Sequence, residues 1–132
     1  MSKLLTLLAA PVVMLALATT ASAAEKKLII GLAVAQSGWL TAYDGDPSAA
    51  IQLAADDFNK TGGILGHKIE LVWSDNKSDP TLAYNAAVEV IEKGAQFVLA
   101  SCDFDKGGAS GVAAQERGIL VMSVCSGSPK WG

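Results

Sequence analysis

Apolar and polar positions along the chain predict strands followed by helices. The run 28–34 is apolar throughout, which is typical of a strand covered by helices on both faces of a parallel sheet. A polar, glycine-containing loop follows it. A helix is then expected to begin at Asp46, as the N-cap, with Pro47 in its first position, and to end at the glycines 62–63. Its apolar positions are Ile51, Ala54, Ala55 and Phe58.

The next segment predicts a second strand and a second helix. Residues 68–75 alternate between apolar and polar side chains, as in a strand near the edge of a sheet. Asp79 is a candidate N-cap, and Pro80 after it suits the first helical position. Gly94 ends the apolar helical pattern. Residues 68–94 are therefore predicted to form a strand followed by a helix, as residues 28–63 are.

Two shorter units complete the pattern. Residues 96–101 predict a short apolar strand, and 105–111 predict a glycine-rich turn that leads into a brief helix ending at Arg117. Residues 119–124 predict a fourth strand. Four alternations of strand and helix favour right-handed crossovers and a parallel α/β sheet flanked by helices.

Parallel sheets bind ligands outside the carboxyl ends of their strands, where loops converge and helix N-termini offer free N–H groups. The predicted elements place four loops at that edge. These loops are 36–46, 74–79, 101–111 and 125–130.

The chain begins with a segment that predicts a cleaved signal peptide, 1–23. Lys3 supplies a basic start, 4–18 is almost entirely apolar, and 21–23 is a small-residue cleavage site. An uncleaved membrane anchor is the alternative, but the apolar run is short for a membrane span. We therefore expect export to the periplasm and a mature part, 24–132.

Charge and length narrow the classes of function. The whole chain carries a net charge of −3, and no cluster of basic residues occurs in it. A nucleic-acid partner is therefore not expected. The mature part, about 108 residues, is long enough for one small domain.

Known cofactor and metal motifs are absent from the sequence. Neither the GxGxxG nor the GxxxxGK[ST] spacing occurs, which disfavours nucleotide binding. His67 is the only histidine, and no cysteine or carboxylate stands at a ligand spacing from it. We expect His67 to be a surface turn residue, and we expect no metal and no cofactor.

Three acidic pairs are candidates for acid–base chemistry. Asp44 and Asp46 are expected to be turn and cap residues, and the pair at 56–57 is expected to be solvated. Asp103 and Asp105 lie on a predicted ligand loop and are candidates for binding. Because no nucleophile–base pair is evident, an exported α/β enzyme is the weaker alternative.

Serines and glycines in the loops suit a small polar ligand that is bound without reacting. Trp39 and Tyr43 can add apolar walls to such a site. The alternative is that each ring packs only against its own turn.

The order of these features resembles that of a known family. From 27 to 130 the chain resembles the amino-terminal part of the periplasmic leucine/isoleucine/valine-binding proteins, and the stretch FNKTGGILGHKIELVWSDNKSDP is its most specific part. The resemblance implies two Rossmann-like lobes that close over a ligand, the type I periplasmic binding fold. The chain would cover about four strand–helix steps, a partial first lobe.

The resemblance also implies roles for single residues. Tyr43 falls where an aromatic side chain borders the ligand, and Phe104 falls where a serine binds the ligand carboxylate. Ser126 and Ser128 retain hydroxyls that can bind a carboxylate. Loss of the hydroxyl at Phe104 predicts an aromatic or amide-like solute in place of a simple aliphatic amino acid.

Two cysteines end neighbouring predicted strands. Cys102 follows the third strand and Cys125 the fourth, so a disulfide at the rim of the cleft and two buried free thiols are the alternatives. Export permits the disulfide. The family's own disulfide cannot form, because Ser78 stands at one of its positions.

The function that the resemblance implies is that of a substrate-binding component of an ABC transporter. It would capture an amino acid or a related small solute for a permease in the inner membrane, and it would not be an enzyme. The ligand-binding ectodomain of a receptor is the other alternative, since folds of this kind also serve signalling.

Overall fold

A computed structural model describes residues 25–123 and 125–131. The predicted signal peptide lies outside this range, as does Val124 of the predicted fourth strand. Across the described ranges, none of the helices has the length and apolar character needed to cross a membrane. The elements, in order, are β1 (Lys27–Val34), α1 (Thr41–Lys60), β2 (Lys68–Asp75), α2 (Pro80–Glu92), β3 (Phe97–Ala100), α3 (Phe104–Gln115), β4 (Leu120–Ser123) and a 3₁₀ turn (Pro129–Trp131).

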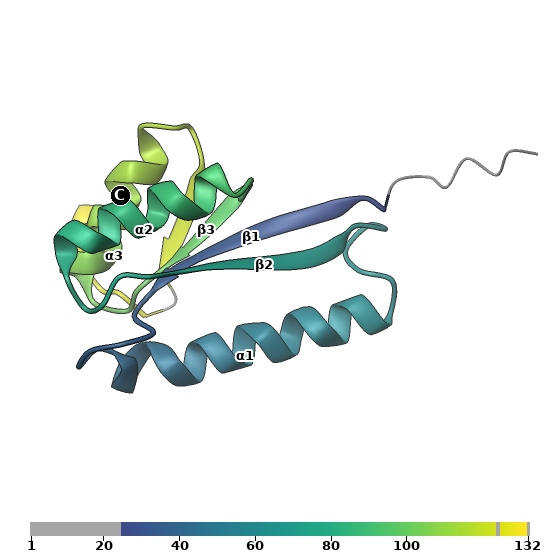
Figure 1. Cartoon of the computed structure of the whole chain (residues 1–132), viewed down its shortest axis with the longest axis horizontal. Coiled ribbons are helices and arrows are strands. Elements are labelled where there is room, and N and C mark those ends of the chain that lie inside the picture. The colour runs from purple at the N-terminus through teal and green to yellow at the C-terminus, as the bar shows by residue number, and fades with distance from the viewer. Residues whose placement is uncertain (1–24, 124, 132) are drawn as a thin grey trace, which may run out of the picture.

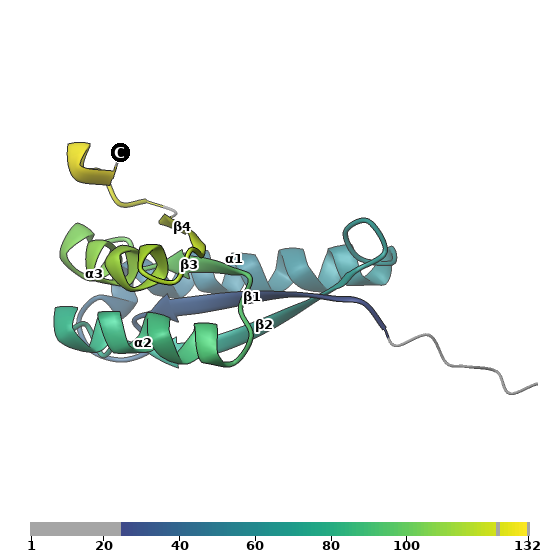
Figure 2. The ribbon, with the colours of Figure 1, turned by 90° about the horizontal axis from the view of Figure 1, so that it is seen from above.

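The four strands form one parallel sheet in the order β2-β1-β3-β4. The predicted parallel α/β fold is therefore confirmed, and β2 lies at the edge of the sheet as expected. In Figure 1, α1 covers the lower face of the sheet, whereas α2 and α3 lie above it. Figure 2 shows that β1 and β2, of eight residues each, extend well beyond the four-residue strands β3 and β4.

The main core lies between β1, β3 and the pair α2–α3. Val90 and Val98 are fully buried there, surrounded by small residues such as Ala86 and Ala113. Gly31 of β1 permits the close approach of α2, because a Cβ at that position would lie 2.6 Å from Cγ2 of Val90. The small residues of helix and strand thus bring the layers together and align the strand ends.

The first helix begins earlier than predicted. α1 starts at Thr41, after Leu40, and Pro47 lies inside it. The expected N-cap at Asp46 is therefore wrong, because tertiary contacts of the residues before it outweigh the local signal. Leu40 is buried, and the N–H groups of Tyr43 and Asp44 both donate to its carbonyl, at 2.9 and 3.0 Å.

The capping prediction for α2 is correct. Oδ1 of Asp79 accepts a hydrogen bond from the N–H of Leu82 at 2.9 Å, and Pro80 is the first helical residue.

The glycine-rich turn predicted at 105–111 is instead part of α3, which begins at Phe104 with Asp103 as its N-cap. Packing explains the difference. Gly107 is buried, and the hydroxyl of Ser110 donates to the carbonyl of Ala83 in α2 at 3.0 Å. Small residues here serve helix–helix contact, and that contact outweighs their weak helix propensity.

Candidate functional site

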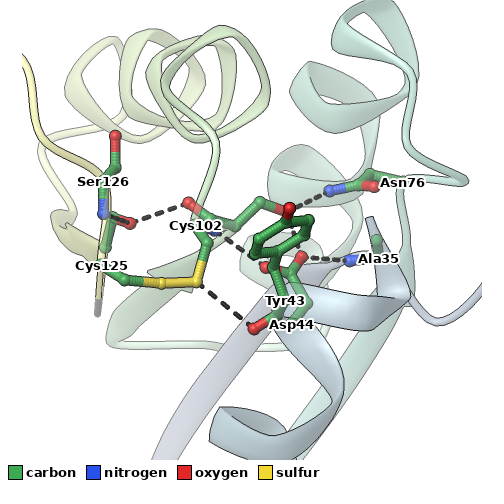
Figure 3. Close-up of a disulfide and its surroundings, with 9 residues drawn as sticks. Ala35, Tyr43, Asp44, Asn76, Cys102, Cys125 and Ser126 are labelled. Carbon is green, nitrogen blue, oxygen red and sulfur yellow. Dashed lines mark hydrogen bonds between the residues drawn. A yellow bond between two sulfur atoms is a disulfide. The ribbon is translucent and has the colours of Figure 1, made fainter. Parts of the chain in front are cut away.

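One buried carboxylate, that of Asp44, joins the carboxyl ends of β1 and β3, and Asn76 links the end of β2 to the same network. Asp44 is 2% exposed and lies in the first turn of α1. Its Oδ2 accepts hydrogen bonds from the N–H of Ala35 at 2.8 Å and the hydroxyl of Ser101 at 2.7 Å. Its Oδ1 accepts one from the N–H of Cys102 at 2.9 Å (Figure 3). Asn76, after β2, donates to the Ser101 hydroxyl oxygen at 2.6 Å and completes the network.

The interpretation of Asp44 as a turn residue is therefore wrong. A buried carboxylate is tolerated when its oxygens accept several hydrogen bonds, and here three donors from two strand ends supply them. The network fixes the start of α1 against β1 and β3. It therefore also fixes the position of Tyr43, the preceding residue.

The loop between β1 and α1 is held by two side chains that lie at or after the end of β2. Asp75 accepts hydrogen bonds from the N–H groups of Gln36 and Ser37, at 2.9 and 3.2 Å, and from the Ser37 hydroxyl at 2.6 Å. The Ser78 hydroxyl accepts one from the N–H of Leu40 and donates one to the carbonyl of Ser37, both at 3.0 Å. The backbone of this loop is thus fixed from both ends.

This anchor predicts a pH dependence. Burial acts to raise the pKa of Asp75, but hydrogen bonds from the Ser37 hydroxyl and the N–H groups of Lys77, Gln36 and Ser37 outweigh it and hold the pKa below its ordinary value of 3.8. Because the folded-state pKa is the lower one, this stabilisation is complete above the unfolded value and is lost as pH falls through the folded value. We expect the loop to loosen only below about pH 4.

An NMR titration of the Gln36 and Ser37 amides measures this loosening. The variant Asp75→Asn should lack the transition at these two amides. If both amides titrate in the variant as they do in the parent protein, another acid controls the loop.

Two aromatic side chains project from this edge. The ring centroids of Trp39 and Tyr43 lie 6.3 Å apart with an interplanar angle of 80°, and the residues are 59% and 61% exposed. Asp103 forms an ion pair with Lys106 at 3.2 Å, and Nζ of Lys106 lies 5.1 Å from the centroid of a Trp39 ring. The structure thus brings together three of the residues predicted from sequence: Trp39, Tyr43 and Asp103.

Phe104 lines a different cavity. It is half-buried, and its ring packs over Gly108, where a Cβ would lie 3.2 Å from the ring. The cavity, of about 830 Å³, is open and lies between α3 and β4, with Ile119 and Lys130 in its wall. Neither Trp39 nor Tyr43 lines it. Whether Phe104 contacts a solute therefore stays a prediction from the resemblance.

The two predicted serines share a third location. Ser126 and Ser128 line a cavity of about 470 Å³ beyond β4, together with Met122 and Ser123. Hydroxyls and a glycine in this segment can bind a carboxylate, so the role predicted for these serines is chemically reasonable.

A disulfide joins the edge around Asp44 to the segment that carries Ser126 and Ser128. Cys102 and Cys125 are bonded, with their Cα atoms 4.7 Å apart (Figure 3). Sγ of Cys102 lies 3.5 Å from the backbone oxygen of Tyr43. The Ser123 hydroxyl donates to the carbonyl of Ser101 at 2.8 Å beside the bridge. The bridge therefore fixes the end of β4 to the edge that carries the aromatic pair.

The groups at this edge can bind a small polar ligand. Hydroxyls, amide groups and aromatic rings are present, whereas His67 lies in its own turn, with Nδ1 3.2 Å from the carbonyl oxygen of Leu65. Across 25–123 and 125–131, no group of three His, Cys, Asp or Glu side chains is arranged to hold a metal ion.

Comparison with known families agrees with this geometry. The model of the periplasmic binding protein family matches residues 27–132, most of the chain. The chain belongs to the periplasmic binding protein family. The resemblance stated from sequence is confirmed.

Two relatives of this periplasmic binding protein are named as Leu/Ile/Val-binding proteins. The Leu/Ile/Val-binding protein BraC3 of Rhizobium johnstonii is 33% identical over 112 residues, which cover 80% of this chain and 29% of that protein. The Leu/Ile/Val-binding protein of Escherichia coli is 28% identical over 88% of this chain and 32% of its own length.

A solved structure shows the same fold. The branched-chain amino acid transporter substrate binding protein LivJ of Streptococcus pneumoniae, in complex with isoleucine, superimposes with a TM-score of 0.75 at 28% identity. The match covers 79% of this chain and 30% of LivJ. This periplasmic binding protein chain thus spans about a third of the length of the relatives it matches.

Sequence reasoning missed the residues that fix the site. Asp75 and Asn76 stand directly at the end of β2, which is the signal that could have identified them, because polar residues after a strand of a parallel sheet face the ligand edge. Lys106 stands three residues after Asp103, the N-cap of its helix, a spacing that permits an ion pair. Asp44 lies in the predicted loop 36–46, but nothing in the sequence shows that its carboxylate is buried.

Proposed function

We propose that this periplasmic binding protein is the substrate-binding component of an ABC transporter. It captures an amino acid or a related small solute in the periplasm and delivers it to a permease in the inner membrane, and it is not an enzyme. Residues 1–23 act as its cleaved signal peptide in this proposal. The names of the relatives in Rhizobium, Escherichia and Streptococcus support the class of solute.

The observation that carries the proposal is the rigid edge built around Asp44. Its hydrogen bonds hold the ends of β1 and β3 and the start of α1, while Asp75 holds the loop before it. Binding sites gain affinity when their groups are ordered before the ligand arrives, because less conformational entropy is lost on binding. An edge that is fixed in this way and carries two exposed aromatic rings is suited to capturing a solute.

The positions of the groups suggest how a solute lies. Its apolar part would contact Trp39 and Tyr43, and its carboxylate would accept hydrogen bonds from Ser126 and Ser128 after β4. A second lobe, which the resemblance implies, would cover the solute from the other side. The preference for an aromatic or amide-like solute rests on Phe104, which has no hydroxyl to offer a carboxylate.

Calorimetric titration of the purified protein tests this function. The panel is leucine, isoleucine, valine, phenylalanine and phenylacetamide, and we expect binding of at least one. Replacing Trp39 or Tyr43 by alanine should weaken that binding about tenfold. Phe58→Ala is the matched control, because Phe58 is also an exposed aromatic on α1 but lies near the opposite end of the helix.

Two outcomes count against parts of the proposal. Failure of every amino acid and amide to bind would remove this class of solute. Tight binding of leucine without binding of phenylalanine or phenylacetamide would retain the transporter function and remove the aromatic preference.

A further inference from the structure

Lys106 is a lysine in an unfavourable place. It is 8% exposed, and it lies in the first turn of α3, where the partial positive charge of the helix end disfavours a cation. Burial of an ammonium group adds a desolvation cost. An apolar residue would fill the same space without either cost, so the charge itself needs an explanation.

Two groups face the ammonium. Oδ1 of Asp103 lies 3.2 Å from Nζ, and the centroid of a Trp39 ring lies 5.1 Å from it. The first contact is an ion pair between the N-cap of α3 and its first turn. The second joins α3 to the loop between β1 and α1, and its distance is that of a cation–π interaction.

Trp39 has little else to fix its ring. Asp75 and Ser78 anchor the backbone on either side of it, at Gln36 and Leu40, but the side chain is more than half exposed and touches Tyr43 edge to face. An exposed indole on a loop can adopt several rotamers. A cation held on one side of the ring favours one of them.

We propose that Lys106 is a positioning residue that holds the Trp39 ring as a wall of the solute site. This inference rests on the proposed function, because the wall matters only if a solute contacts it. Asp103 fixes the ammonium group by the ion pair, and the ammonium group fixes the indole by the cation–π contact. The indole is therefore ordered beside Tyr43 before a solute binds. The conformational entropy of the ring is then lost when the protein folds and not when the solute binds.

The chain offers a matched control for the ion pair. Asp57 and Lys60 form a pair of the same spacing, with 2.8 Å between Nζ and Oδ1, but both side chains are well exposed at the end of α1. Lys60→Met and Lys106→Met remove the same charge and retain a side chain of similar length. A difference between them therefore reports the surroundings of Lys106 and not the loss of a charge.

The first test needs no solute. In the NMR spectrum of the protein, the ε-methylene protons of Lys106 should be shifted upfield by the ring current of Trp39, and Trp39→Leu should abolish the shift. An ordinary chemical shift for these protons, or one that Trp39→Leu leaves unchanged, would overturn the proposal whether or not any solute binds.

The second test uses the solute that calorimetry identifies. Lys106→Met should weaken its binding about threefold to tenfold, and Lys106→Arg should restore most of the loss, since a guanidinium also stacks on an indole. Lys60→Met should bind as the parent protein does. Unchanged affinity in Lys106→Met, or equal losses in Lys106→Met and Lys60→Met, would overturn the proposal. If the parent protein binds no solute in the panel, the proposed class of solute fails, while the NMR test still decides the contact.

Discussion

Replacing Asp44 with alanine is expected to lower the free energy of unfolding by about 3–5 kcal/mol. The change leaves the N–H groups of Ala35 and Cys102 without their acceptor, and it removes the acceptor of the Ser101 hydroxyl. Each buried donor that loses its partner costs about 1–3 kcal/mol, and the hydroxyl can recover part of its loss by rotating. Urea denaturation followed by circular dichroism measures the change.

Two further variants separate the network from the charge. Asp44→Asn keeps one good acceptor oxygen, so its loss of stability should lie between those of the parent protein and Asp44→Ala. Asp46→Ala changes an exposed carboxylate two residues further along α1 and should alter stability by less than about 0.5 kcal/mol. Similar losses for Asp44→Ala and Asp46→Ala would show that the network does not hold the strand ends.

Substitution of Asp44 should also weaken solute binding. Asp44 adjoins Tyr43 and holds the residue after β3, so its loss frees two parts of the edge at once. Calorimetry on Asp44→Asn, the milder variant, can test this while the protein remains folded. We expect weaker binding in that variant at a temperature well below its melting point.

The succession of strands and helices along the chain could be predicted from sequence, because it depends on local pattern. The apolar run of β1 and the cap and proline of α2 each lie within a few neighbouring residues. The start of α1 and the glycine-rich first part of α3 were predicted wrongly for the opposite reason. α1 begins early because Leu40 is buried and Asp44 bonds to distant strands, and α3 includes glycines because it packs against α2.

The site divides in the same way. Trp39, Tyr43 and Asp103 could be named because the sequence predicts them on loops after strands, where a parallel sheet binds its ligands. The residues that order them could not, since their partners are remote in sequence. Asp44 bonds to Ser101 across 57 positions, and Asp75 bonds to Ser37 across 38. Only the folded sheet brings these partners together.

The double variant Cys102→Ser, Cys125→Ser is expected to lose about 3 kcal/mol of stability. The bridge closes a loop of 23 positions, and without it the unfolded chain gains the entropy of that loop. The loss should be concentrated in β4, an edge strand of four residues in which Leu120 and Met122 are exposed. Without the bridge, two interactions would still hold the end of β4. These are its pairing with β3 and the hydrogen bond from the Ser123 hydroxyl to the Ser101 carbonyl.

Hydrogen exchange at the amides of 120–123 measures this local effect, and denaturation with and without a reductant measures the global one. Reductant should lower the stability of the parent protein to that of the double variant, and it should leave the double variant unchanged. Because Cys102 also contacts the backbone of Tyr43, exchange at that residue should rise as well. Faster exchange in β4 with Tyr43 unaffected would show that the bridge holds only the edge strand and does not hold the backbone of Tyr43.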